Sequence, residues 1–96
     1  MEEKRIRSYG ITIGELPTGR YNKITDVPGV TVGHSTIDTE EHKTGVTVVM
    51  PCQDNIFASK MLASCFVWNG FGKTTGLVQI KELGTLETPI VLTNTL

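Results

Sequence analysis

The sequence lacks any apolar run approaching the roughly 20 residues that are needed to span a bilayer. It also lacks a surplus of basic residues, since nine Lys and Arg face ten Asp and Glu, for a net charge of −1. Nucleic-acid binding proteins normally show a basic surplus or patch. No apolar signal-peptide segment follows the start of the sequence. We therefore expect a cytoplasmic protein without a membrane or nucleic-acid partner.

Cysteine is scarce. Cys52 and Cys65 are 13 residues apart, a spacing that fits neither a Cys-x-x-Cys redox pair nor a zinc motif. No other His or Cys pair has the spacing of metal ligands, so neither a metal nor a cofactor is expected. We expect the two cysteines to be small buried side chains without a disulfide.

Motifs of nucleophilic catalysis and of nucleotide binding are missing as well. The sequence has no Gly-x-Ser-x-Gly segment, and none of its four serines has a recognisable nucleophile context. His34 lies on an apolar strand face and is interpreted as a hydrogen-bonded core histidine. Gly72-Lys73-Thr74 matches the end of a P-loop, but Val67 stands where the first glycine is required. No catalytic residue is assigned in this chain.

The sequence does have ten glycines, which are spread along its length. Residues 1–29 are rich in glycine and proline, which is typical of an extended, turn-rich lead-in. Pro28-Gly29 predicts a type II turn, because proline fixes φ at the second position and glycine accepts the positive φ of the third. Residues 30–96 carry the regular elements, so residues 1–96 are interpreted as a single partial domain.

Four segments predict strands. Residues 30–37 alternate in polarity and residues 44–50 are rich in β-branched side chains, so we expect two strands that pair antiparallel across a charged turn. Residues 65–68 predict a short buried strand, and residues 89–93 predict a last strand that begins at a proline. Because a strand that ends the sequence has nothing after it to cover its edge, we expect the domain to be truncated at its carboxyl end.

One helix is expected, over residues 74–83. Leu77, Ile80 and Leu83 recur every three residues and form an apolar stripe. Gly84 follows at the position where a left-handed residue ends a helix. The segment from Gly70 to Gly72 is a glycine-rich strand-to-helix turn. The pattern as a whole predicts an α/β (α+β) fold with a mixed or antiparallel sheet and one clear helix.

Four blocks of this sequence carry a resemblance to a known family through their order and spacing, namely residues 22–34, 44–51, 69–77 and 82–95. Together they resemble the L-aminopeptidase/D-esterase and β-peptidyl aminopeptidase family. The resemblance implies an αββα sandwich of the ornithine acetyltransferase type. It also implies a precursor that cuts itself, so that the new amino-terminal Ser of the second chain becomes the nucleophile and its amino group can act as general base. Members release N-terminal residues from peptides, amides or esters, form homo-oligomers and need no metal.

The resemblance places the nucleophile beyond the Thr-Asn-Thr segment, so it implies that this chain alone is inactive. The partners that it implies are the remainder of the precursor or a second chain, and a peptide or amino-acid amide or ester as substrate. The residues that match motifs near the active-site cleft are Asn69, Gly70, Gly72, Thr93, Asn94 and Thr95. Many members have an acidic residue where this chain has Lys73, which would repel a substrate ammonium.

Two alternatives stay open at this point. The Thr93-Asn94-Thr95 segment is also typical of simple turn chemistry, in which Asn and Thr side chains bond their own backbone. The whole chain is also consistent with a non-catalytic structural or interaction module derived from the same family.

Overall fold

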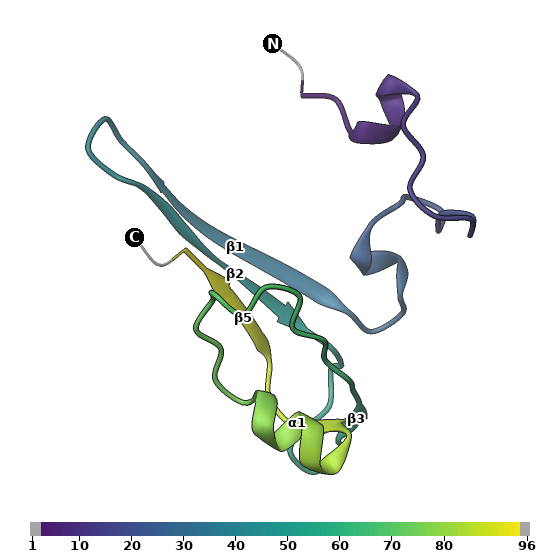
Figure 1. Ribbon diagram of the computed structural model, residues 1–96, viewed down its shortest axis with the longest axis vertical. Coiled ribbons are helices and arrows are strands. Elements are labelled where there is room, and N and C mark those ends of the chain that lie inside the picture. Colours follow the sequence, from purple (N-terminus) through teal and green to yellow (C-terminus); the bar gives the residue numbers. More distant parts are fainter. Residues whose placement is uncertain (1–2, 95–96) are drawn as a thin grey trace.

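A three-stranded antiparallel sheet is the main element of the structure, a computed structural model that describes residues 3–94 (Figure 1). Its strands are β1 (Thr31–Asp38), β2 (Lys43–Met50) and β5 (Ile90–Thr93), in the order β1-β2-β5. The predicted antiparallel pairing of the first two strands is confirmed. The α+β class is confirmed as well, since one α-helix accompanies antiparallel sheets.

The register of the sheet leaves β2 only partly covered by β5. Strand β1 pairs with β2 along its whole length, from Thr31 opposite Met50 to Asp38 opposite Lys43. Strand β5 pairs only with the second half of β2, from Thr93 opposite Val46 to Ile90 opposite Val49. The tip of the β1–β2 hairpin therefore extends past β5, as Figure 1 shows.

Two short strands and a helix form a smaller unit beside the sheet. Strand β3 (Met61–Leu62) pairs antiparallel with β4 (Thr85–Leu86), and α1 (Leu77–Leu83) comes directly before β4. The helix begins three residues later than predicted because Gly76 adopts a left-handed φ of 94°. It ends as predicted at Gly84, whose φ is 68° and whose N–H donates to the Ile80 carbonyl at 2.7 Å.

The predicted strand over residues 65–68 is wrong. This segment has no regular structure, and within it the side chains of Phe66 and Trp68 are 81% and 90% exposed. A strand needs a neighbouring strand for its backbone hydrogen bonds, and β3 and β4 pair over only two residues each. The apolar character of residues 65–68 therefore does not place them in a sheet.

The lead-in, residues 3–29, is held together by hydrogen bonds between its own residues. It contains two short 3-10 helices, η1 (Ile6–Tyr9) and η2 (Ile24–Asp26). The Arg5 guanidinium donates to the backbone carbonyls of residues 21 and 22. The Asp26 carboxylate accepts the backbone N–H groups of residues 21 and 23, at 3.0 and 3.3 Å. The predicted turn at Pro28-Gly29 is confirmed by the positive φ of 86° at Gly29 and by a 3.2 Å hydrogen bond from Val30 to Val27.

The described residues form almost no core. Val49 and Ile56 are the buried apolar side chains between residues 3 and 94. The accessible surface is 8796 Å², whereas a compact monomer of 10.5 kDa exposes about 5,400 Å². The radius of gyration is 16.2 Å, against about 12.5 Å for a compact chain of 96 residues. Most apolar side chains of this chain therefore remain uncovered.

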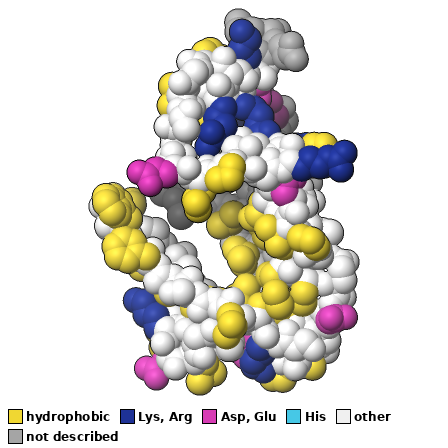
Figure 2. Space-filling model, turned by 90° about the vertical axis from the view of Figure 1, so that its right-hand side faces the viewer, with side chains coloured by type: hydrophobic (Ala, Val, Ile, Leu, Met, Phe, Trp, Pro, Cys, Tyr) yellow, Lys and Arg dark blue, Asp and Glu magenta, His cyan; other side chains and the backbone are white. Residues whose placement is uncertain are grey.

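Strands β2 and β5 carry apolar side chains on both faces of the sheet. Residues that pair directly across an antiparallel sheet point to the same face, and successive residues alternate between faces. Val48 and Val91 thus lie on one face, and Val49 and Ile90 lie on the other. Figure 2 shows apolar side chains gathered along one side of an opening in the surface. A sheet that is apolar on both faces has the pattern of an inner layer covered on both sides.

No helix among residues 3–94 is long and apolar enough to cross a membrane.

Candidate functional site

A hollow of about 470 Å³ lies between strand β5 and the segment that leads into α1. Its lining comes from Gly72 to Thr75 on one side and from Val91 to Thr93 on the other. Gly72 and Thr93 were predicted separately, from motifs far apart in the sequence. The structure brings them to the wall of the same hollow.

A second hollow, of about 360 Å³, adjoins the first. Thr74, Thr75, Val91 and Leu92 line both hollows, so the two lie side by side with these residues between them, and we call the pair the cleft. The further walls of the second hollow are formed by residues of α1 and β4 and by Glu87. The start of α1 at Leu77, directly after the left-handed Gly76, places the helix against this end of the cleft.

Glu87 is the one carboxylate in this lining, and it is paired. Its Oε2 lies 3.6 Å from the Lys60 ammonium, and about a quarter of the Glu87 side chain is exposed. Lys60 and Glu87 flank β3 and β4, so the pairing of these two strands brings them together. Nothing in the sequence signalled this pair, because it depends on a tertiary contact between residues 27 positions apart.

The remaining glycine of the predicted loop lies on a different hollow. Gly70 and Gly72 line a third space of about 470 Å³ within the loop of residues 65–77. Gly70 has a φ of 69°, a value that favours glycine because it has no Cβ. Asn69, also predicted as a cleft residue, is exposed and does not belong to the lining of these three hollows.

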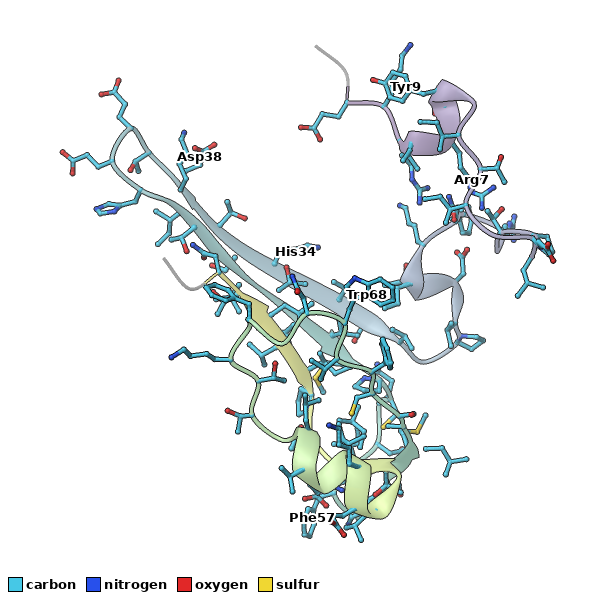
Figure 3. All side chains as sticks on the ribbon, in the orientation of Figure 1. Arg7, Tyr9, His34, Asp38, Phe57 and Trp68 are labelled. Atoms are coloured by element: carbon cyan, nitrogen blue, oxygen red, sulfur yellow. The ribbon has the colours of Figure 1, made fainter. Side chains whose placement is uncertain are left out.

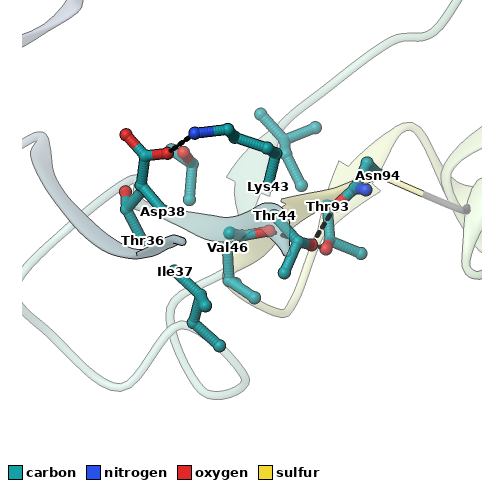
Figure 4. Close-up of a pocket in the computed structure, with 11 residues that line it drawn as sticks. Thr36, Ile37, Asp38, Lys43, Thr44, Val46, Thr93 and Asn94 are labelled. Atoms are coloured by element: carbon teal, nitrogen blue, oxygen red, sulfur yellow. Dashed lines mark hydrogen bonds and ion pairs between the residues drawn. The ribbon is translucent and has the colours of Figure 1, made fainter. Parts of the chain in front are cut away.

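The end of β5 is anchored to β2. The Thr93 hydroxyl donates to the Gly45 carbonyl at 2.8 Å, and the Thr44 hydroxyl donates to Asn94 Oδ1 (Figure 4). The alternative in which these side chains bond their own backbone is wrong for Thr93 and Asn94, because their partners, Gly45 and Thr44, belong to β2. Thr93 and Asn94 line an open groove of about 730 Å³ beside the hairpin tip. Thr95 lies outside the described residues.

His34 and the cysteines take no part in this cleft. His34 is hydrogen-bonded as predicted, with Nδ1 at 2.8 Å from Thr47 Oγ1, but it is exposed rather than in a core (Figure 3). Cys52 and Cys65 are free and half-buried, so they are less buried than predicted. Within residues 3–94 no three His, Cys, Asp or Glu side chains converge as metal ligands do.

Comparisons with known proteins agree on one family. The model of peptidase family S58 matches residues 22–96. Two relatives are named beta-peptidyl aminopeptidase BapA. The chain is 35% identical over 100 residues to the protein from Sphingosinicella xenopeptidilytica and 34% identical over 103 residues to that from Sphingosinicella microcystinivorans. These matches cover 95% and 98% of this chain but 24% and 26% of the relatives.

A solved structure is similar as well. It is the crystal structure of the PH0078 protein from Pyrococcus horikoshii OT3, with a TM-score of 0.83 and 48% sequence identity over 96% of this chain. The match covers 29% of that protein, so the chain spans about a quarter of the length of the relatives that it resembles. Because the family model matches residues 22–96 and the relatives are 34–48% identical to this chain, the chain belongs to peptidase family S58.

Proposed function

We propose that this chain is the amino-terminal part of a serine aminopeptidase, which hydrolyses N-terminal residues from peptides, amides or esters after autoproteolytic activation. The observation that carries the proposal is the cleft, in which the glycine-containing loop at Gly72 and the β5 residue Thr93 face the same space. Membership of peptidase family S58 and the similarity to two beta-peptidyl aminopeptidases support the same activity.

In this proposal the chain supplies the sheet and one wall of the cleft, and the nucleophilic serine comes from another part of the protein. The two apolar faces of the sheet support this division, because each needs a covering layer that residues 3–94 do not provide. The covering layers would complete an αββα sandwich around β1, β2 and β5.

Asn94 lines the open groove next to the cleft rather than the cleft itself, and Thr93 lines both, so we propose that Asn94 acts on the substrate from that side. Its Oδ1 accepts the Thr44 hydroxyl, so the Nδ2 end of the carboxamide is the one that can donate to a carbonyl oxygen. A fixed donor at that oxygen stabilises the charge that develops when the serine attacks. Thr44 acts through Asn94 in this scheme and is a positioning residue.

The test uses the protein as its natural gene encodes it and measures the release of p-nitroaniline from an aminoacyl-anilide. We expect Asn94→Ala to lower kcat by on the order of 10- to 100-fold with little change in KM, as for the loss of a donor that acts in the transition state. Thr44→Val keeps the donor but frees its orientation, so its effect should be smaller. Unchanged kcat in Asn94→Ala would remove Asn94 from the mechanism.

A second measurement separates this function from that of a non-catalytic module. The intact masses of the purified protein should show two chains that stay together, and the isolated 96-residue chain should release no p-nitroaniline. Activity of the isolated chain, or a full-length protein that never cleaves itself and has no activity, would contradict the proposal.

A further inference from the structure

Lys73 gives one end of the cleft a positive charge. It lines the hollow between β5 and the segment that leads into α1, together with three threonines and the apolar side chains of β5. Among the described residues that line the two hollows, the acidic one is Glu87, which lines the second hollow and is paired with Lys60. The charge of Lys73 is therefore not neutralised from within the cleft.

The groups around Lys73 are those that bind a carboxylate. Thr74 and Thr75 line the same hollow and carry hydroxyl donors, and the lysine ammonium carries three more N–H donors. The Thr93 hydroxyl is not among them, because it already donates to the Gly45 carbonyl. Hydrogen bonds from such donors to an ionised oxygen are stronger than bonds between neutral groups. Because Lys73 is exposed, its ammonium stays hydrated at the mouth of the hollow and does not bear the cost of a buried, unpaired charge.

From this geometry we infer that Lys73 is a specificity-determining residue, which selects substrates carrying a free carboxylate on the leaving-group side of the scissile bond. The class of substrate is a short peptide with both termini free, such as a dipeptide. The inference rests on the proposed aminopeptidase activity. The same positive charge repels the substrate ammonium, so the amino terminus lies away from Lys73, at the end of the cleft that contains Glu87.

The experiment compares two substrates that differ only in charge. One is a dipeptide with a free carboxyl group, and the other is the corresponding dipeptide amide, both assayed with the full protein. An exposed charge pair typically changes affinity about two- to fivefold, so we expect Lys73→Met to lower kcat/KM for the free acid by about fivefold at low salt. The amide has no carboxylate for Lys73 to bind, so its kcat/KM should change less than that of the free acid, and urea unfolding that matches the wild type shows that the variant folds.

Two further variants sharpen the test. Lys73→Glu reverses the charge, so it should lower the ratio of kcat/KM for the free acid to kcat/KM for the amide by more than Lys73→Met does. Lys81→Met is the matched control, because Lys81 is an exposed lysine of α1 that does not line the cleft. It should leave the ratio of the two kcat/KM values unchanged. Added salt should reduce the preference of the wild type for the free acid.

The outcomes distinguish this inference from the proposed function. A wild type that hydrolyses both substrates, with a ratio that neither Lys73 variant alters, would overturn the role of Lys73 and leave the aminopeptidase proposal intact. A wild type that hydrolyses neither substrate nor any aminoacyl-anilide would overturn both. A ratio that falls in Lys73→Met, falls further in Lys73→Glu and stays constant in Lys81→Met is the supporting result.

Discussion

Gly45 offers the sharpest test of how closely β1 and β2 pack. A Cβ atom built at Gly45 would lie 2.8 Å from the Ser35 carbonyl oxygen and 3.4 Å from the Thr36 Cα. Real Cβ atoms do not approach a backbone atom to 2.8 Å, so Gly45→Ala must push the two strands apart near this pair. Inserting one methyl group into a packed site costs about 1–3 kcal/mol, and here the atoms that must move belong to the backbone.

Gly33 provides the matched control in the same pair of strands. A Cβ at Gly33 meets nothing within 4 Å, and its φ is not left-handed. Gly33→Ala should therefore stabilise the protein by about 0.4–1 kcal/mol, because alanine has fewer conformations to lose from the unfolded chain. The two substitutions are chemically identical, yet the structure predicts opposite signs for their effects on the free energy of unfolding.

Urea unfolding of the full protein measures both changes, and hydrogen exchange followed by mass spectrometry locates them. In Gly45→Ala the amides of β1 and β2 should exchange faster, and so should those near Thr93, whose hydroxyl donates to the Gly45 carbonyl. If Gly45→Ala proved as stable as the wild type, or more stable than Gly33→Ala, the register assigned to this hairpin would be wrong.

The remaining predictions concern the ends of α1 and the lead-in. Gly84→Ala should destabilise the protein by about 1 kcal/mol in urea unfolding, because an L side chain at its φ of 68° is strained. Gly84→Asn should lose about half as much, since asparagine tolerates this conformation, and equal losses would refute the explanation. Asp26→Ala removes the acceptor of two backbone N–H groups, so the amides of Tyr21 and Lys23 should exchange faster while those of β2 do not change.

The hairpin could be predicted from the sequence because its information is local. The β-branched residues of β2 and the length of the charged turn are enough to specify two antiparallel strands. The ends of the helix were harder. Gly84 ends α1 as predicted, but α1 starts at Leu77, the first residue of the apolar stripe, three residues later than the predicted start at Thr74. A glycine near the first turn is compatible with both starts, and only its left-handed φ decides between them.

Residues 65–68 show where composition misleads. Their apolar character predicted a buried strand, yet Trp68 is exposed on a loop without regular structure (Figure 3). Burial depends on what covers a side chain, and nothing among residues 3–94 covers this one. Whether residues 65–68 are buried therefore depends on other parts of the protein and cannot be predicted from the sequence of this segment.

The candidate cleft was predictable only in pieces. The motifs at Gly72 and at Thr93 could each be found, but their meeting at one hollow depends on how the loop, α1 and β5 pack together. The Lys60–Glu87 pair at the other end had no sequence signal. Asn69 was predicted from its motif, and the structure does not bring it to the cleft.

The near absence of a core bears on how long this polypeptide survives in a cell. With Val49 and Ile56 as the buried apolar side chains of the described residues, few contacts oppose local unfolding. Quality-control proteases and chaperones recognise exposed apolar segments, and they remove chains that stay open. We therefore expect the abundance of the protein to follow the rate at which the covering layers proposed above reach the sheet. Substitutions that slow this encounter should act as loss-of-function changes even when they leave the cleft intact.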